Sequence, residues 1–334
     1  MRILLITGGW SGERQVAING AKALQAAMLS LGHAVEWFDL TQSLSGLAEA
    51  TRRNDVAFIN LHGSPGEDGL VQAALDRLGF PYQGSGPAAS MLALDKAAAK
   101  EFFRMAGLQT APSVFLPHHP GADWQCPVPF PLFIKDNVGG STVNLEYVET
   151  PADLPASLDR LFARGGAYLC EAGVKGIEIT CGIIGELRTN TDGVEVEEPT
   201  ALPPILIRAT KGGHFDYESK YTAGGAEEIC PAPIAPELTA KVQAMTLTAH
   251  RALGLSGYSR ADFIIPTEGE GKDEPVILEI NTLPGMTATS LIPQELAAVG
   301  VSFAQMVDKL VALGLARKAR AEVCAGQCPS PEKG

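Results

Sequence analysis

Two apolar, strand-like segments near the C-terminal end each carry polar residues two positions apart. VILEIN contains Glu279 and Asn281, and YSRADFII contains Arg260 and Asp262. Successive side chains of a strand point to opposite faces, so each pair shares one face. Burying such groups without partners costs roughly several kcal/mol. If the two strands are neighbours in one sheet, the four side chains face a common site.

Three of these four residues offer oxygen ligands. Asp262, Glu279 and Asn281 have no Cys or His beside them, a donor set that suits Mg²⁺ rather than Zn²⁺. Because Mg²⁺ retains water and phosphate oxygens in its shell, the pattern favours a nucleotide triphosphate site. A buried ion-pair network of Arg260 with the two acids would give the same sequence, and these segments alone do not decide between the two interpretations.

The first 87 residues alternate between strand and helix patterns. Apolar runs at 2–7, 34–38 and 55–60 are separated by helical stretches at 13–31 and 44–52, and a further helix is expected at 70–78. This βαβαβ order predicts a parallel sheet with helices on its faces. The sequence does not fit a dinucleotide-binding unit, because Gly8, Gly9 and Gly12 do not match GxGxxG and Glu13 would repel a pyrophosphate.

The rest of the chain predicts two smaller α+β units and a tail. The boundaries fall at 88–174, 175–318 and 319–334, and the last segment is expected to be disordered because it lacks apolar periodicity. The central unit should open with a helix at 92–106 and then hold strands at 131–135, 145–149 and 167–171 and a second helix at 153–162. The C-terminal unit should begin with a hairpin at 177–184 and close with a helix at 303–318. A long segment, 203–229, is predicted to be a functional or disordered loop.

Composition narrows the class of partner and the compartment. A net charge of −12 argues against nucleic acid or an anionic membrane as partner. The six cysteines form no CxxC pair, which is typical of free thiols in a reducing cytosol. No apolar run approaches the length of a transmembrane helix. A cytoplasmic protein is expected.

Two other segments support the nucleotide interpretation. DNVGGSTVN offers backbone amides and hydroxyls for an anion, and Lys135 and Lys96 could supply cations to phosphate. A bulged hairpin and solvated lysines would have the same composition. YLCEAGVKGIEI places Glu171 and Glu178 on either side of a short linker, where carboxylates and backbone groups could bind adenine and ribose.

An ordered set of motifs resembles the ATP-grasp enzymes and, within them, the D-alanine:D-alanine ligases: SGERQV, LHGSPGEDG, YQGSG, LDK, FDYESKY, YSRADF and LEINTLPGMTATSLIP. The resemblance runs from Arg2 to about Lys318. It implies an α/β ATP-grasp fold, in which an N-terminal parallel unit precedes two α+β units that enclose ATP. It implies that two D-alanine molecules are joined through an acyl phosphate, giving D-alanyl-D-alanine, ADP and phosphate for peptidoglycan synthesis, by a cytoplasmic homodimer.

The resemblance also implies which residues bind the nucleotide and metal. ATP contacts fall on Lys96, Lys135, Gly140, Ser141, Thr142, Glu171, Ala172, Val174, Glu178 and Lys220. Two Mg²⁺ ions, for which Mn²⁺ can substitute, fall on Asp262, Glu279 and Asn281.

Substrate and catalytic roles follow in the same way. Glu13 would bind the first ammonium, and its alternative role is to stabilise a helix start. His62 would lie near the second ammonium or be a structural histidine; Ser290 and the Leu291 amide would hold the second carboxylate, with Lys220 also on the substrate side. Arg260 and the Gly285 amide would stabilise the oxyanion. Tyr221, on a lid, would form a hydrogen-bonded set with Glu13 and Ser141.

Several positions depart from the family pattern. The phosphate loop reads KDNVGGSTVN where KPSREGSSVG is usual, and Gln15, Ala17 and Ala172 replace the more common Glu, Ser and Lys. These changes leave the second substrate open to D-lactate or D-serine. The alternative from another class is an ATP-binding regulatory module that has lost catalysis. Such a module would be expected to lack a metal ligand or the oxyanion arginine. The presence of all four residues, Asp262, Glu279, Asn281 and Arg260, argues against it.

Overall fold

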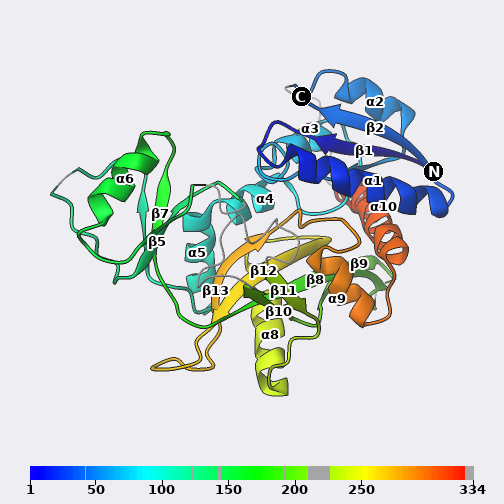
Figure 1. Ribbon diagram of the computed structural model, residues 1–334. Coiled ribbons are helices and arrows are strands. Elements are labelled where there is room, and N and C mark those ends of the chain that lie inside the picture. Colours follow the sequence, from blue (N-terminus) through cyan, green and yellow to red (C-terminus); the bar gives the residue numbers. More distant parts are fainter. Residues whose placement is uncertain (42, 122, 141–143, 192, 210–225, 328–334) are drawn as a thin grey trace.

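Within the residues that the structure describes, three sheets form the frame of the molecule (Figure 1). This computed structural model describes residues 1–334 except 42, 122, 141–143, 192, 210–225 and 328–334. The sheets belong to an N-terminal, a central and a C-terminal unit, which follow one another along the chain. The mixed α/β architecture that the sequence predicted is confirmed.

The N-terminal sheet is parallel, in the order β2-β1-β3. Its strands are β1 (Arg2–Gly8), β2 (Ala34–Leu40) and β3 (Val56–Ile59). The helices of this unit are α1 (Arg14–Ser30), α2 (Leu47–Arg53) and α3 (Leu70–Arg77). The apolar side chains of Ile3, Leu4, Leu5 and Ile6 are fully buried, because helices cover this sheet. The predicted βαβαβ order is therefore confirmed.

The closing helix α10 (Phe303–Gln327) returns to the N-terminal unit and packs against α1 and β3 (Figure 1). Its residues Met306, Val307 and Leu310 join the core of that unit. The predicted end near Lys318 was too early, because α10 continues to Gln327 through a stretch that contains three alanines, the best helix former. Residues 319–327 are therefore helical, and residues 328–334 of the predicted tail lie outside the described residues.

The central unit begins with two helices where one was predicted. They are α4 (Pro87–Leu94) and α5 (Lys96–Met105). Asp95 separates them: its backbone is extended, and its side chain accepts a hydrogen bond from the Ala98 amide at 2.9 Å. This is the geometry of a helix N-cap. The prediction of one continuous helix was wrong because the capping preference of Asp95 outweighed the surrounding helix formers.

The central sheet is antiparallel, in the order β4-β7-β5-β6. Its strands are β4 (Ser113–Leu116), β7 (Tyr168–Ala172), β5 (Leu132–Asp136) and β6 (Glu146–Val148), and α6 (Leu154–Phe162) packs against it. The edge strand β4 was not predicted, since it lies in a segment interrupted by prolines. The sheet and α6 share a small apolar core of their own.

The C-terminal sheet is built around β8 (Ile177–Thr189), which forms the predicted hairpin with β9 (Glu195–Ala201). The main strand order is β11-β10-β8-β12-β13. The other strands are β10 (Ile205–Ala209), β11 (Ala226–Ile229), β12 (Tyr258–Ile265) and β13 (Val276–Asn281). Strands β10 and β11 occupy the two ends of the segment 203–229, so the prediction of a loop was wrong at these ends. The sequence of β10, ILIRA, contains β-branched isoleucines, which favour a strand.

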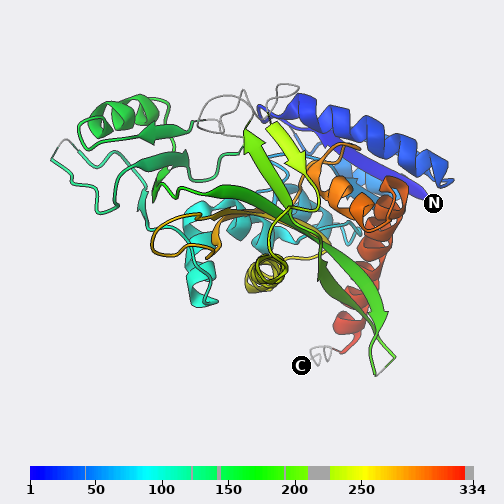
Figure 2. The same ribbon diagram turned by 60° about the horizontal axis from the view of Figure 1, so that its bottom comes forward.

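Two helices pack on the C-terminal sheet. Helix α8 (Pro236–Ala252) contacts β8, β9 and β12, and the short helix α9 (Leu291–Ala298) packs on β8. Figure 2 shows the long β8–β9 hairpin reaching alongside the C-terminal helix. Among described residues, no single helix is long and apolar enough to cross a membrane; one pair, Leu291–Ala298 with Phe303–Arg317, meets that test together but is bent by 107°.

Candidate active site

The two polar strands are neighbours in one sheet, which is the condition under which their polar residues were expected to share a site. Strand β12 pairs antiparallel with β13, and the register sets Arg260 opposite Asn281 and Asp262 opposite Glu279. Directly opposed residues project from the same face of a sheet. The pairing shifts immediately after Asp262, which bends the strand at the point where the polar residues end.

Asp262 forms a tightly held ion pair with Arg260. Arg260 donates from Nε to Oδ1 at 3.0 Å and from a terminal nitrogen to Oδ2 at 2.8 Å, while the Thr180 hydroxyl donates to Oδ1 at 2.6 Å. Burial alone would lower the pKa of the Arg260 guanidinium, but the Asp262 carboxylate raises it above its usual value. Part of the alternative interpretation, a buried ion-pair network, is therefore present: Arg260 pairs with Asp262.

The other carboxylate is placed differently. The Glu279 side chain is about a third exposed, and its Oε2 lies 3.8 Å from Lys96 Nζ. Asn281 Nδ2 lies 3.4 Å from Asp262 Oδ2, so the amide contacts the same carboxylate as Arg260. Two carboxylates and one amide thus meet on one sheet face, and this is an all-oxygen donor set for a hard cation. The described residues contain no metal-type cluster of three or more His, Cys, Asp and Glu.

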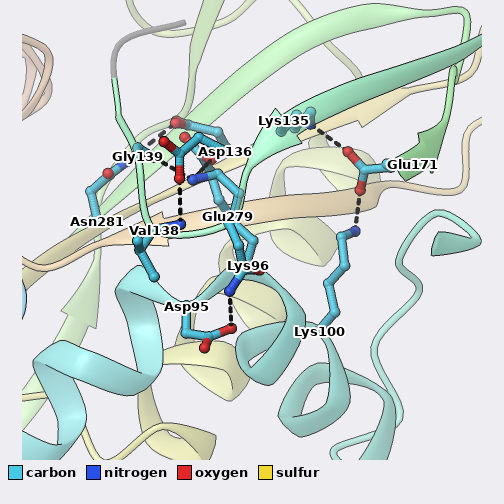
Figure 3. Close-up of polar contacts among 12 residues, drawn as sticks. Asp95, Lys96, Lys100, Lys135, Asp136, Val138, Gly139, Glu171, Glu279 and Asn281 are labelled. Atoms are coloured by element: carbon cyan, nitrogen blue, oxygen red, sulfur yellow. Dashed lines mark hydrogen bonds and ion pairs between the residues drawn. The ribbon is translucent and has the colours of Figure 1, made fainter. Parts of the chain in front are cut away.

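The start of α5 is joined to the first half of the glycine loop (Figure 3). Lys96 donates from Nζ to the Gly139 carbonyl at 2.5 Å, and its amide donates to the Asn137 carbonyl at 3.0 Å. The Asn137 side chain accepts from the Ala97 amide at 2.9 Å and donates to Asp95 at 2.8 Å. The N-terminus of α5, with its positive end of the helix dipole, therefore faces the loop that was predicted to bind phosphate.

The rest of that loop can be followed only in part. A Cβ added at Gly140 would lie 3.3 Å from Glu13 Oε2, so the loop approaches the first helix of the chain closely. The predicted contacts Ser141 and Thr142 lie outside the described residues. So do Lys220 and Tyr221 of the predicted lid.

Glu171 lies between two lysines, Lys135 and Lys100 (Figure 3). Its carboxylate is almost fully buried, and each lysine forms a close ion pair with one of its oxygens. Burial would raise the pKa of Glu171, but the two ammonium groups lower it below the usual value. Sequence analysis did not identify Lys100. Its only signal is the spacing KAAAK, which sets it one helical turn after Lys96, and such a lysine ordinarily points to solvent.

Lys135 occupies the centre of the polar site. The carboxylates of Glu171, Glu279 and Glu178 surround its ammonium group and raise its pKa, against the effect of burial, which would lower it. Glu178 lies on β8 opposite Ile264, just after the linker from β7. In that linker the Gly173 amide donates to the Pro131 carbonyl at 2.8 Å, which fixes the backbone between Ala172 and Val174. Among the described residues, the predicted base and ribose contacts on β7, the linker and β8 therefore lie next to Lys135, one of the predicted phosphate contacts.

The N-terminal unit contributes a second group of polar residues. Glu13 is the residue before α1, and its side chain makes no capping bond. His62 is half-buried and lies close to Glu13, Arg260 and the Leu283 backbone; burial lowers its pKa, and Glu13 opposes that effect. Glu67, which sequence analysis missed, accepts hydrogen bonds from the amides of Gly63 at 2.8 Å and Leu283 at 3.4 Å. Burial raises the pKa of Glu67 to about 7.

The turn after β13 completes the site. Ser290 is the residue before α9, and its Oγ accepts from the Thr287 amide at 3.0 Å. A Cβ at Gly285 would lie 2.9 Å from Ser290 Oγ, so the close packing of this turn favours glycine. Leu291 is the first residue of α9, where backbone amides face outward along the helix axis. The residues predicted to hold the carboxylate of the second substrate, Ser290 and Leu291, therefore lie together at one helix N-terminus.

The fold and the site define the class of protein. A parallel N-terminal unit precedes two antiparallel α+β units, and lysines and carboxylates gather where these two sheets meet. This is the ATP-grasp architecture. Residues 114–312 match the family model described as D-ala D-ala ligase C-terminus.

Known ligases are similar to this protein over nearly the whole chain. The D-alanine--D-alanine ligases of Oleidesulfovibrio alaskensis and Desulfovibrio desulfuricans are 57% and 53% identical, covering 95% of this chain and 97% and 98% of those proteins. A Bacillus anthracis D-alanine--D-alanine ligase complexed with ATP superposes with a TM-score of 0.78 at 28% identity, over 96% of this chain and 99% of that one. The VanG D-Ala:D-Ser ligase of Enterococcus faecalis gives 0.76 at 26% identity, over 93% and 98%.

The chain belongs to the D-alanine--D-alanine ligase family. It is therefore a ligase that forms a carbon–nitrogen bond, as the sequence motifs implied.

Proposed function

We propose that this enzyme uses ATP and Mg²⁺ to join two D-alanine molecules through an acyl phosphate, giving D-alanyl-D-alanine for peptidoglycan synthesis. The observation that carries the proposal is the β12–β13 register, which sets Arg260, Asp262, Glu279 and Asn281 on one face. Lys96 lies 3.8 Å from this face, and Glu13 approaches the glycine loop at its edge. These groups converge where a nucleotide, a carboxylate and an amine would meet.

In the first step the carboxylate of one D-alanine attacks the γ-phosphorus of ATP, and the bond to the ADP oxygen breaks. Phosphoryl transfer requires charge neutralisation and alignment more than covalent help from the protein. Lys96 and Lys135 supply positive charge, and the N-terminus of α5 adds its dipole. Glu171, Glu178 and the backbone of Ala172 and Val174 hold the adenosine end. Glu13 holds the ammonium group of the first D-alanine.

The oxygen donors on β12 and β13 fit Mg²⁺. Asp262, Glu279 and Asn281 would hold two ions between the sheet and the phosphates, and Mn²⁺, which accepts the same hard ligands, would substitute. When bound, the ions would neutralise charge on the β- and γ-phosphates. Asp262 is already oriented by Arg260 and Thr180, whereas Glu279 is more exposed and retains room for ligands.

In the second step the amine of the second D-alanine attacks the acyl carbonyl, and phosphate leaves with the bonding electron pair. Arg260 and the Gly285 amide stabilise the oxyanion that develops on the carbonyl oxygen. Ser290 and the Leu291 amide, at the start of α9, bind the carboxylate of this second substrate. His62, which lies close to Glu13 and Arg260, would face the ammonium group of the second substrate.

The predicted lid carries Tyr221 and Lys220, and we propose that it closes over the acyl phosphate and excludes water. Tyr221→Phe tests the proposed contact with Glu13 and Ser141. Slower turnover together with faster proteolysis of the lid in the presence of ATP supports the contact. Unchanged kinetics and unchanged proteolysis would remove it.

The reaction itself is tested by phosphate release from ATP and Mg²⁺, with the product identified by mass spectrometry. D-alanine alone, L-alanine alone, and D-alanine mixed with D-lactate or D-serine are compared. The proposal predicts release with D-alanine, formation of the dipeptide, and only background release with L-alanine. Bound ATP without D-alanine-dependent release would contradict the assigned substrate.

D-Serine is the second candidate for the amine substrate. The structural similarity to the D-Ala:D-Ser ligase of Enterococcus faecalis supports it, as do the unusual Gln15 and Ala17 near the first helix. The mixed-substrate assay decides between the two: a predominant D-alanyl-D-serine product at equal substrate concentrations would replace the leading proposal. The much higher identity to the D-alanine--D-alanine ligases of Oleidesulfovibrio alaskensis and Desulfovibrio desulfuricans favours the D-alanine product.

The assembly and compartment are also proposed. We expect a cytoplasmic homodimer, with the N-terminal unit supplying the contact. Sedimentation velocity at micromolar concentration tests the assembly, and a monomer throughout the accessible range would contradict it. Recovery of the activity in the membrane fraction after cell lysis would contradict the compartment.

A further inference from the structure

One buried lysine of the site has no role in the reaction proposed above. Lys100 lies on α5 and is 1% exposed, and its ammonium group forms an ion pair with the equally buried Glu171. An ammonium group loses its hydration on burial, so it is tolerated only where a charge or several hydrogen bonds replace the water. Lys100 is therefore fixed to one carboxylate rather than free to move.

Lys100 also makes a contact on the opposite side. Its Nζ donates to Thr110 Oγ1 at 2.5 Å, and Thr110 in turn donates from Oγ1 to the Ile277 carbonyl at 2.9 Å. The Ile277 amide donates to the Gln109 carbonyl at 2.9 Å, so this junction is doubly bonded. Ile277 lies on β13, two residues before Glu279. Lys100 thus connects the Glu171 carboxylate, through Thr110, to β13, the strand that carries Glu279 and Asn281.

Glu171 has two cationic partners, and their surroundings differ. The carboxylates of Glu178 and Glu279 also act on Lys135, which is the lysine proposed above to face phosphate. Lys100 pairs with the other carboxylate oxygen of Glu171 (Figure 3) and is more buried, since its side chain is 1% exposed and that of Lys135 is 19% exposed. It also contacts Thr110. If nucleotide binding draws Lys135 toward a phosphate, Lys100 remains as the charge partner of Glu171 and would keep this carboxylate compensated.

We infer that Lys100 is a positioning residue for nucleotide selection: it keeps the Glu171 carboxylate ionised and fixed, so that the site accepts an adenine amino group and rejects a guanine carbonyl. This inference rests on the proposed function, since it presumes that Glu171 faces the base. Adenine presents a hydrogen-bond donor at its exocyclic position, whereas guanine presents an acceptor there. An ionised carboxylate is an acceptor only, so it discriminates by attraction and repulsion together.

The direction of the pKa shifts agrees with this arrangement. The pKa of Glu171 lies below its usual value despite complete burial, because Lys135 and Lys100 both stabilise the carboxylate. The pKa of Lys100 is lowered, chiefly by burial and against the effect of Glu171. Removing Lys100 would leave Glu171 to one partner, and protonation of Glu171 would then convert an acceptor into a donor that a guanine carbonyl tolerates.

The test is Lys100→Met, which retains the length and apolar body of the side chain without its charge. Dissociation constants for ATP and GTP are measured by calorimetry on the full-length protein, alongside kcat and KM for ATP. We expect the ATP dissociation constant and KM to rise roughly tenfold or more, the preference for ATP over GTP to fall by a similar factor, and kcat to change much less. Lys100→Arg, which retains the charge, should recover part of the preference. Lys241→Met, an exposed ion-pair partner of Glu274, is the matched control and should match the wild type.

A double variant separates positioning from folding. The double variant Lys100→Met with Glu171→Gln removes both buried charges, so it should fold even if Lys100→Met alone does not. Its preference for ATP over GTP should be no lower than that of Glu171→Gln alone. A Lys100→Met protein that loses stability but keeps the wild-type ratio of ATP to GTP affinity would overturn the inference. The inference would also be overturned if the double variant lost as much preference for ATP over GTP as the two single variants lose together. Failure of the wild type itself to bind ATP would instead refute the proposed function.

Discussion

Buried acids of the site make the stability of the enzyme depend on pH. Glu67 has a pKa of about 7 in the folded protein, raised by burial from a reference value of 4.5. An acid whose pKa is raised by folding stabilises the protein at low pH, and this contribution is lost as the pH rises from about 4.5 through 7. Glu67 should therefore lower the free energy of unfolding by up to about 3 kcal/mol between pH 5 and pH 8.

Urea unfolding of the wild type and of Glu67→Gln across this range measures that contribution. The variant should lose this part of the pH dependence, because glutamine keeps the acceptor for the Gly63 amide but does not ionise. Glu49→Gln, an exposed change on α2, is the control and should follow the wild type. Equal slopes in wild type and Glu67→Gln would contradict the assignment.

Glu279 tests the metal site at the level of a single residue. Glu279→Gln keeps the shape of the side chain and removes its charge, so the fold should persist while Mg²⁺-dependent turnover falls by roughly a hundredfold or more; outer-shell partners alone are worth about ten- to a hundredfold. Phosphate release measured against Mg²⁺ concentration, with circular dichroism for the fold, gives the result. A variant with near-normal turnover would place the metal elsewhere.

At the level of single residues, strand periodicity predicted more than composition did. The alternation along β12 and β13 placed each pair of polar side chains on one face, and the register of the two strands brings all four together. Lys100 and Glu67 could not be found in this way. Each acquires its surroundings from another part of the chain, Lys100 from Glu171 and Glu67 from Leu283, and local sequence carries no record of such contacts.

Among the structural elements, the junction between α4 and α5 has the clearest functional consequence. Asp95 caps α5 and also accepts a hydrogen bond from Asn137, so one side chain fixes both the helix start and the glycine loop. Asp95→Ala should lower the free energy of unfolding by about 1–2 kcal/mol, as expected for the loss of an N-cap. It should also raise the KM for ATP, because Lys96 lies in the first turn of α5.

Asp95→Asn is the companion variant, since asparagine also caps helices well. It should retain most of the stability, and its KM should lie between those of the wild type and Asp95→Ala. Urea unfolding and steady-state kinetics on the three proteins provide the comparison. An alanine variant with reduced stability but a wild-type KM would show that the cap does not position the loop.

Long, strongly patterned elements were predicted well, and short or interrupted ones were not. The βαβαβ unit and strands β5, β7, β12 and β13 lie close to their expected positions. Strands β4, β10 and β11 were missed because prolines or glycines interrupt the segments that contain them, and each takes its hydrogen bonds from another strand. Their existence depends on the sheet they join, which a local pattern does not encode.

For the molecule as a whole, the site exists because all three units meet. The Leu283 amide of the C-terminal unit reaches Glu67 of the N-terminal unit at 3.4 Å, and Arg317 donates to the Gly84 carbonyl at 2.7 Å. Arg317 also stacks over the Tyr82 ring at 4.4 Å. Two contacts therefore hold the N-terminal unit against the C-terminal unit, one at Glu67 and one at Arg317. This packing brings Glu13 and Arg260 into one site.

The central claim is that a carboxylate of D-alanine becomes an acyl phosphate before the peptide bond forms. The most direct measurement supplies D-alanine labelled with heavy oxygen in its carboxylate, together with ATP and Mg²⁺, and analyses the released phosphate and the product by mass spectrometry. The mechanism predicts one heavy oxygen in phosphate for each dipeptide formed, because the carboxylate oxygen that attacks phosphorus leaves with it. Dipeptide formed alongside unlabelled phosphate would contradict the acyl phosphate and, with it, the assigned reaction.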